Sequence, residues 1–397
     1  MQYVFEYDDK NRVIYTSGID NFQAAKINYY PEQGYNEVIY LVHTNKKEFY
    51  YYDENFLVYK KVDAEGGETW YDYTANLERQ LISSPNGKTI GYKFDELGNI
   101  SEMIHPDGSS ISYKYNNDGQ ITNRIDAKGN VEFWQYDNTK RLIKYLNPLG
   151  DELTYNYIDD NRLPNSLYKN GKLISEYQYN AANQLTLSTK SDSIIQQWRY
   201  DAYGRLSYFN PKESITIGLK RDTLGRVATF SQSQKSDIQI SYDAYDLPIK
   251  IADNKLQMEF DYTPMGSLKK QLSYNTHDKK NTRALHFFYD DYENLIGISN
   301  EKNEKYKFIR NKRDEVVEKI EFDGTQKTYL RDADGLVTKR IDSHGTEVHY
   351  QYDVAGRLTH VVYDDADYEA YYYDASGLLI EAENQHNSVQ FQRNALG

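Results

Sequence analysis

Three residue types that active sites use recur together in this chain. Residues 200–206 read Tyr-Asp-Ala-Tyr-Gly-Arg-Leu, so a phenol, a carboxylate and a guanidinium follow one another at short, fixed spacing. Groups of this kind carry acid–base chemistry in many enzymes. Seen once, the stretch could pass for a catalytic motif.

The same seven-residue pattern returns elsewhere in the chain. Residues 352–358 read Tyr-Asp-Val-Ala-Gly-Arg-Leu, and residues 373–379 read Tyr-Asp-Ala-Ser-Gly-Leu-Leu. In residues 221–227 an arginine replaces the tyrosine. Catalysis needs one site, whereas regular copies indicate equivalent structural corners. The motif residues that we assign are Tyr200, Asp201, Gly204, Arg205, Leu206, Tyr352, Asp353, Gly356, Arg357, Leu358, Tyr373, Asp374 and Gly377.

The repeated aspartates could also be calcium ligands, as in some β-solenoids. Each turn offers only one carboxylate reliably, and Thr74, Asn116 and Ile158 stand where the first aspartate is missing. Capping of the turn by an Asx-type hydrogen bond is therefore favoured over calcium binding.

Other catalytic patterns find less support. Acidic pairs such as Asp159-Asp160, Asp290-Asp291 and Asp364-Asp365 could suggest paired-carboxylate hydrolysis, but they fall at or near expected turns. The eight histidines show no metalloprotease spacing, and no Gly-x-Ser-x-Gly or phosphate loop occurs. We predict no enzyme activity and no catalytic, cofactor or metal residue.

The motif is one part of a repeat of about 21 residues. We call its first residue position zero and number the units 1 to 19 in chain order. The position-zero residues are Tyr7, Tyr30, Tyr52, Tyr73, Phe94, Tyr115, Tyr136, Tyr157, Tyr179, Tyr200, Arg221, Tyr242, Tyr262, Tyr289, Arg310, Arg331, Tyr352, Tyr373 and Arg393.

Each unit reads as strand, turn, strand, turn. Aromatic residues two positions before position zero, such as Tyr113 and Trp198, share a strand face with it. A corner turn follows, with Gly, Asn or Asp four residues after position zero, the residues that tolerate positive φ. A mid-unit turn such as Pro106-Asp107-Gly108 closes the hairpin.

Composition supports a thinly cored, β-rich protein. Only 39% of the 397 residues are hydrophobic, but 41 are tyrosine, which favours half-buried strands. The net charge of -13 argues against nucleic-acid binding, and the absence of cysteine excludes disulfides and thiolate metal sites. No apolar run is long enough for a membrane helix, and no signal peptide is visible at the start.

These features predict one all-β fold over residues 1–397. Tandem hairpins should form a single long antiparallel ribbon, which twist would wind into a spiral or into a hollow shell, complete or incomplete. The 27-residue step from Tyr262 to Tyr289 predicts a longer loop near residues 274–283. The last copy stops at Gly397, so we expect a fragment of a larger protein.

The Tyr-Asp-x-x-Gly-Arg-Leu core at this period resembles the YD-repeat, or Rhs-repeat, family over nearly the whole chain. Members include bacterial Rhs polymorphic toxins, shell components of insecticidal toxin complexes, and animal teneurins. The resemblance implies a β-strip that spirals into a hollow shell. It also implies a secreted or cell-surface bacterial setting as part of a larger protein.

Two departures from the toxin members matter. Their repeats end in an Asp-Pro-x-Gly core where self-cleavage frees the cargo, and no Asp-Pro dipeptide occurs here. We also expect no toxin-like domain within residues 1–397, since repeats run to Gly397.

Two functions follow from the resemblance. The first is a structural wall that encloses a C-terminal toxin cargo together with other shell segments. The second is surface adhesion or carbohydrate binding, with sugar rings stacking on the aromatic face. Neither requires a cofactor, nucleic acid or membrane insertion by this segment.

Overall fold

The computed structural model describes residues 3–18, 23–41, 46–212 and 214–397. These residues form one antiparallel sheet of 37 strands, with a single short 3-10 turn at Pro31–Gln33 and no α-helix. The predicted all-β ribbon of tandem hairpins is confirmed. The prediction of two strands per unit is met closely along the whole strip.

The strands follow one another without crossovers. They are β1 (Val4–Tyr7), β2 (Val13–Ser17), β3 (Ala25–Tyr30), β4 (Tyr35–Tyr40), β5 (Lys46–Tyr52), β6 (Val58–Val62), β7 (Glu68–Tyr73), β8 (Arg79–Ser83), β9 (Thr89–Phe94), β10 (Ile100–Ile104), β11 (Ser110–Tyr115), β12 (Ile121–Ile125), β13 (Val131–Tyr136), β14 (Leu142–Leu146), β15 (Glu152–Asn156), β16 (Ser166–Lys169), β17 (Lys172–Tyr179), β18 (Leu185–Lys190), β19 (Ile195–Tyr200), β20 (Leu206–Lys212), β21 (Ile215–Arg221), β22 (Val227–Gln232), β23 (Ile238–Tyr242), β24 (Pro248–Ala252), β25 (Leu256–Tyr262), β26 (Leu268–Asn275), β27 (Asp278–Tyr289), β28 (Leu295–Asn300), β29 (Lys305–Arg310), β30 (Val316–Ile320), β31 (Gln326–Arg331), β32 (Val337–Asp342), β33 (Glu347–Tyr352), β34 (Leu358–Tyr363), β35 (Tyr368–Tyr373), β36 (Leu379–Asn384) and β37 (Ser388–Gln390).

Each strand pairs only with its neighbours in sequence. In β19 the side chains alternate between exposed and half-buried, and the half-buried set includes Trp198 and Tyr200. This is the period-two pattern that the sequence predicts. Trp198 stacks on Phe209 of the next strand with ring centroids 5.2 Å apart, and Trp134 meets Tyr145 at 5.4 Å. Cross-strand aromatic pairs of this kind stabilise the sheet locally.

Almost nothing in the strip is fully buried. The buried apolar residues of the described chain are Ala24, Ala25, Tyr274, Val348, Val361 and Ala370. A single layer has no second sheet to cover it, so stability must come from contacts between neighbouring hairpins, as in other repeat arrays. The fold therefore depends on what joins one unit to the next.

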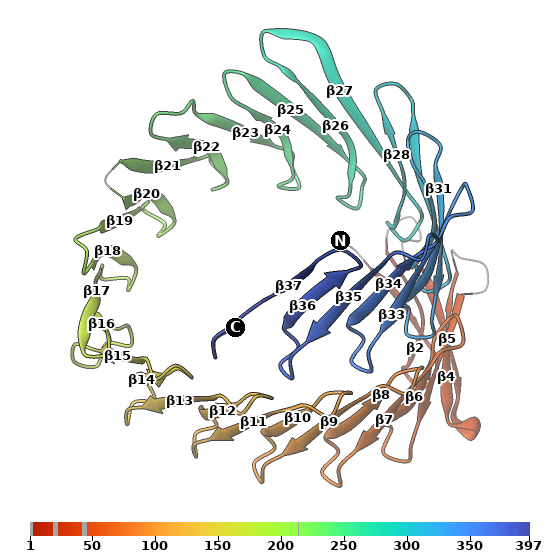
Figure 1. Cartoon of the computed structure of the whole chain (residues 1–397). Helices are drawn as coiled ribbons and strands as arrows, with labels where there is room; N and C mark the ends of the chain where they lie inside the picture. Colours follow the sequence, from red (N-terminus) through yellow and green to blue (C-terminus); the bar gives the residue numbers. More distant parts are fainter. Residues whose placement is uncertain (1–2, 19–22, 42–45, 213) are drawn as a thin grey trace.

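The strip winds into a coil instead of lying flat (Figure 1). The blue C-terminal strands pass alongside the orange strands near the N-terminus (Figure 1). In the described residues, β1 and β37 are not paired, so the sheet does not close on itself. The strong right-handed twist of antiparallel ribbons accounts for this curvature.

The segment near residues 274–283 differs from the predicted loop. β26 and β27 run on past the usual hairpin length, and β27 has 12 residues. Asn275 pairs with Asp278 across a two-residue tip, and the Asn275 side-chain oxygen accepts the His277 N–H at 2.9 Å. The insertion lengthens a hairpin because a regular two-residue turn lets the extra backbone groups pair with one another.

No helix in the described residues is long and apolar enough to cross a membrane.

The mid-unit turns allow a direct test of their backbone conformation. Gly129 has φ of +82°, and nothing lies within 4 Å of a Cβ added there. Substitution Gly129→Ala should lower the free energy of unfolding by about 1 kcal/mol through backbone strain alone. Gly129→Asn should cost less than half of that, because asparagine adopts this conformation more readily. Urea unfolding followed by tryptophan fluorescence measures both; equal costs would contradict this explanation.

Candidate functional site

The motif at residues 200–206 forms the corner turn between β19 and β20. The Gly204 N–H donates to the Asp201 carbonyl at 3.0 Å, and the Asp201 N–H donates to the Arg205 carbonyl at 2.8 Å. Gly204 has φ of +77°. This is a type I turn followed by a bulge residue in the left-handed region, a common three-residue hairpin connection.

The Asp201 carboxylate is fully engaged inside its own turn. Its Oδ1 accepts the N–H groups of Tyr203 and Arg205 at 2.9 and 3.0 Å. Its Oδ2 accepts Arg205 Nε at 2.8 Å. The Arg205 backbone N–H first, and then its guanidinium, lower the pKa of Asp201. Asp353 holds Ala355 and Arg357 in the same way.

Asp374 caps its turn differently, because Leu378 stands in place of the arginine. Its Oδ1 accepts the N–H groups of Ser376 and Leu378 at 2.9 and 3.0 Å. Its Oδ2 is left to reach Lys128, a residue in a distant unit, at 3.1 Å. Because the corner carboxylates are saturated by these donors, they offer little to a calcium ion.

The position-zero tyrosine joins its unit to the unit before. The Tyr200 hydroxyl donates to the Leu185 carbonyl at 2.9 Å, 15 residues earlier. Tyr352 reaches Val337 and Tyr373 reaches Leu358 over the same separation. The accepting carbonyl belongs to the first residue of the strand that follows the previous corner. The hydroxyl therefore fixes the spacing between successive hairpins.

Arginine at position zero makes the same connection. The guanidinium of Arg221 donates to Leu206 at 3.1 Å, that of Arg310 to Leu295 at 3.0 Å, and that of Arg331 to Val316 at 2.9 Å. Both side chains are long and end in a hydrogen-bond donor. The exchange of tyrosine for arginine therefore preserves the contact. From the sequence, this exchange indicates only that the motif is not catalytic.

The corner arginine extends this linkage forward along the chain. The Arg141 guanidinium lies 4.6 Å from the Tyr157 ring centroid, and Arg226 lies 4.8 Å from that of Tyr242. Arg357 lies 5.2 Å from Tyr373 in the same way. Each of these arginines binds its own aspartate and covers the position-zero ring of the next unit, a favourable cation–π arrangement.

The acidic pairs of the sequence lie apart from any catalytic arrangement. Asp159-Asp160 and Asp364-Asp365 occupy exposed positions in turns. The Asp290 carboxylate accepts the N–H groups of Tyr292 and Asn294, both at 2.9 Å. Among the residues that the structure places, no group of three or more His, Asp or Glu side chains is arranged to hold a metal ion.

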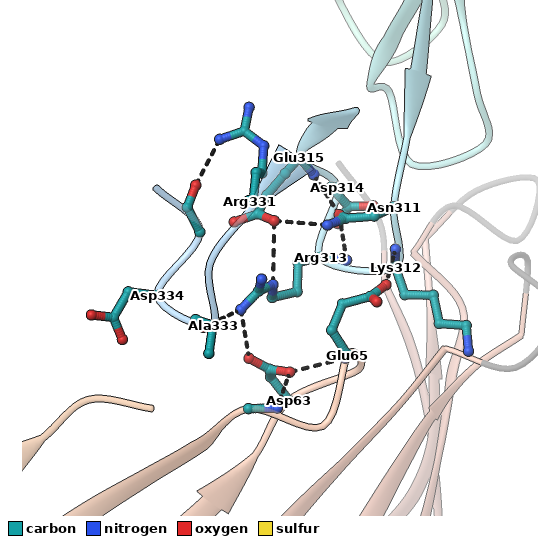
Figure 2. Close-up of polar contacts among 12 residues, drawn as sticks. Asp63, Glu65, Asn311, Lys312, Arg313, Asp314, Glu315, Arg331, Ala333 and Asp334 are labelled. Atoms are coloured by element: carbon teal, nitrogen blue, oxygen red, sulfur yellow. Dashed lines mark hydrogen bonds and ion pairs between the residues drawn. The ribbon is translucent and has the colours of Figure 1, made fainter. Parts of the chain in front are cut away.

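Beyond the corner itself, the structure brings together two edges of the strip. Corner turns of late units rest on mid-unit turns of early units, and we call this contact line the seam. Figure 2 shows Arg313, from the corner between β29 and β30, directed at Asp63, from the turn between β6 and β7. The Lys312 N–H also donates to Glu65 Oε1 at 2.7 Å.

Four successive ion pairs follow the seam. The pairs are Arg313 Nη1 with Asp63 Oδ2 at 3.3 Å, Asp334 Oδ2 with Lys88 Nζ at 3.0 Å, Arg357 Nη2 with Asp107 Oδ2 at 2.9 Å, and Asp374 Oδ2 with Lys128 Nζ at 3.1 Å. Units 15, 16, 17 and 18 thus rest on units 3, 4, 5 and 6. One turn of the coil takes twelve units.

The seam also includes an aromatic and cationic contact. Lys46 lies against Asp314 with its ammonium 2.5 Å from Oδ2 and 4.7 Å from the Tyr40 ring centroid. Tyr40 meets Tyr292 edge to face at 6.1 Å. The cation is thereby held between a carboxylate and ring faces on opposite sides of the seam.

Three seam carboxyls have lowered pKa values. Burial alone would raise the pKa of Asp334, but the Asn86 N–H and the Lys88 ammonium outweigh it. Burial likewise opposes the lowering at Asp374, where the Leu378 N–H and Lys128 prevail. For Asp107 the Ser109 hydroxyl is the largest cause, with Arg357 adding to it. The folded coil therefore favours the charged forms.

A cavity of about 530 Å³ lies along the seam, bordered by turn residues such as Pro106, Pro148 and Gly377. Two pairs of its charged side chains bind one another: Arg124 binds Glu132 at 2.7 Å, and Arg357 binds Asp107. The cavity lies between residues of early and late units of the coil.

The seam partners Asp63, Lys88, Asp107 and Lys128 were not anticipated from the sequence. Each lies 246 to 250 residues from its partner. These pairings could be predicted only if it were known that one turn of the coil takes twelve units.

Two family models match parts of this chain. The model described as Teneurin YD-shell matches residues 3–192, and the model described as RHS Repeat matches residues 331–367. No curated protein matches the chain.

Solved structures of toxin-complex proteins share the fold. The TcdB2-TccC3-TEV structure has a TM-score of 0.73 at 13% identity, covering 99% of this chain and 27% of that one. The TcdB2-TccC3-Cdc42 structure has a TM-score of 0.73 at 12% identity, with 98% and 26% covered. A Photorhabdus luminescens Tc holotoxin pore structure gives 0.70 at 13%, with 99% and 26% covered. The chain spans about a quarter of these proteins' length.

The position-zero hydrogen bond can be tested at Tyr200. Tyr200→Phe leaves the Leu185 carbonyl without its donor and should lower the free energy of unfolding by about 1 kcal/mol. Tyr200→Arg should cost clearly less, because arginine makes this contact at Arg221. Tyr203→Phe, at a ring that is 83% exposed, serves as the control with little effect. Equal losses for phenylalanine and arginine in urea unfolding would contradict the proposed linkage.

The seam carboxyls predict a defined pH dependence. Because the pKa values of Asp107 and Asp334 are lowered from 3.8, their stabilisation is complete above that pH and is lost as the pH falls through the folded-state values. The double variant Asp107→Asn, Asp334→Asn should be less stable by about 1 kcal/mol at pH 5–8, and the difference should shrink as the pH falls below 3.8 through the lowered folded-state pKa values. Asp118→Asn, at an exposed pair, is the control. A difference in urea unfolding that shows no decrease at any pH below 3.8 would rule out this origin.

Proposed function

The chain belongs to the YD-repeat, or Rhs-repeat, family, and from this we propose that it is a wall segment of a shell that encloses a toxin polypeptide. The role is structural and involves no catalytic residue of this segment. The observation that carries the proposal is the seam, where the strip packs edge to edge after one turn. A strip that seals against itself forms a continuous wall, which a flat sheet does not.

The mechanism is steric exclusion. A wall of paired strands leaves few free backbone edges for a protease or a binding partner, since each inner strand is hydrogen-bonded on both sides. The corner-turn edge and the mid-unit-turn edge of the strip are not joined by strand pairing. The ion pairs of the seam join these two edges. A polypeptide inside would be hidden from proteases and kept from acting on its host.

The rest of the shell would come from further repeats. This chain spans 26–27% of the toxin-complex proteins whose fold it shares, so other shell segments would complete the enclosure. Those structures are of TcdB2 together with TccC3. We propose the same general setting here: a secreted or cell-surface assembly that delivers its cargo to other cells.

The alternative is an adhesive or carbohydrate-binding surface. Its best support is the exposure of Tyr203 and Tyr245, 83% and 85%, on corner turns two units apart. The position-zero rings are less suited to sugars, because hydroxyls such as that of Tyr352 are used by the backbone. Glycan-array binding that is lost in Tyr203→Ala, Tyr245→Ala, with the fold retained, would favour this alternative.

Protease protection tests the shell directly. In the full-length protein, the polypeptide enclosed by the repeats should resist proteinase K while the coil is intact. A variant that breaks two seam pairs, Lys88→Glu with Arg313→Glu, should become cleavable inside the cargo, because the wall opens along the seam. Lys93→Glu, which removes an exposed pair away from the seam, is the matched control. Cargo cleaved equally fast in the unmodified protein would refute encapsulation.

A further inference from the structure

The four ion pairs of the seam alternate in sign. Along the corner edge, units 15 to 18 present Arg313, Asp334, Arg357 and Asp374. Along the mid-unit edge, units 3 to 6 present the opposite series, which is Asp63, Lys88, Asp107 and Lys128. Neighbouring units on either edge therefore carry opposite charges.

The turn backbones alone do not distinguish one register from the next. In residues 84–88, 105–109 and 126–130 the fourth residue donates its N–H to the first carbonyl at 2.8 to 2.9 Å in every case. Their glycines all have φ between +77° and +82°. A corner turn would meet nearly the same backbone surface if the coil were one unit tighter or looser.

The charges do distinguish the registers. If the coil slipped by one unit in one direction, Arg313 would face the turn of Lys88, Asp334 that of Asp107, and Arg357 that of Lys128. In the other direction the same three residues would face Lys46, Asp63 and Lys88. Each of these contacts brings together two named side chains of like charge. The turn of Lys128 also contains Asp126, whose carboxylate is already used to cap that turn. Asp374 would also meet like charge, because a slip by one unit in either direction would bring it to the turn of Asp107 or to that of Asp151.

We propose that this alternation sets the winding of the coil at twelve units per turn by excluding the two adjacent registers. Twist and curvature bring the corner edge and the mid-unit edge together, and the seam charges determine which units pair across them. The inference concerns the strip itself and holds whatever the shell encloses.

The environment of the pairs makes the penalty effective. The seam side chains are largely withdrawn from water: exposure is 10% for Asp334, 18% for Asp107 and 17% for Arg313. Favourable pairs near a surface add little stability. Like charges forced into the same half-buried place lose hydration and gain no partner. Such groups contribute more to specificity than to affinity.

The corner of unit 15 makes the discrimination two-sided. Arg313 binds Asp63 of unit 3, whereas its neighbour Asp314 binds Lys46, at the end of the mid-unit turn of unit 2. A slip that moved Arg313 toward Lys88 would move Asp314 toward Asp63. Both members of this corner would then meet like charge.

Engineered cysteines can report the register, because the chain contains none. The pair Glu65→Cys with Lys312→Cys reports the native register, where these residues touch. The pairs Glu65→Cys with Ala333→Cys and Asn86→Cys with Lys312→Cys report the two slipped registers. Adjacent units are about 10 Å apart along an edge, beyond the reach of a disulfide, so each pair reports one register.

The decisive variant inverts one edge at units 15 and 16, with Arg313→Glu and Asp334→Lys, because Arg357 and Asp374 also hold their own corner turns. Native-register crosslinking should fall by roughly tenfold or more, with a slipped-register crosslink rising in its place. Adding Asp63→Lys and Lys88→Glu should restore the native crosslink. Lys93→Glu with Asp118→Lys, which alters exposed pairs away from the seam, should leave it unchanged.

Each outcome decides the question. Loss of the native crosslink that the compensating edge restores supports the proposal, whether or not a slipped crosslink is trapped. An inverted edge that still crosslinks in the native register overturns it. A compensated variant with β-sheet circular dichroism but no native crosslink also overturns it, because charge complementarity would then be insufficient.

Discussion

The hydrogen bond from position zero to the carbonyl 15 residues earlier is the contact on which this fold depends. A single-layer sheet has almost no core, so each hairpin must be held by its neighbours along the strip. The tyrosine hydroxyl and, in other units, the arginine guanidinium supply the same donor at the same place. The corner aspartate and arginine together hold the turn that precedes the acceptor strand. In units such as that of Arg226, the arginine also covers the position-zero ring of the next unit. The repeated motif is therefore a linkage between units.

The seam is the second level of organisation and depends on the first. Regular spacing along the strip makes regular curvature possible, and curvature brings units 15 to 18 over units 3 to 6. The local linkage recurs in most units, with exceptions such as Phe94, which has no donor, whereas the seam residues differ in charge from one unit to the next. The repeated motif thus produces a regular strip. The residues that differ in charge between units determine, in our proposal, which units meet when the strip winds.

The regular features of this fold could be predicted from the sequence, because period-two aromatics and glycine spacing are local signals. The corner at Gly204, the mid-unit turn at Gly129 and the all-β strip follow from them. The insertion could not, since the sequence shows extra length but not that Asn275 and Asp278 would close a tight tip. The contact of Arg357 with Asp107 could not be predicted from the sequence either, because it depends on the accumulated twist of many strands. The structural equivalence of Tyr200 and Arg221 could be recognised only once the position of the accepting backbone carbonyl was known.

A high-resolution experimental structure of the chain, by crystallography or electron cryomicroscopy, tests the central claim most directly. The claim is a strip linked unit to unit that meets itself after twelve units. The map should show the Tyr200 hydroxyl on the Leu185 carbonyl, and Asp107 beside Arg357 across the seam. A strip that remains open, or one in which Asp107 lies beside the corner of a neighbouring unit, would contradict the account.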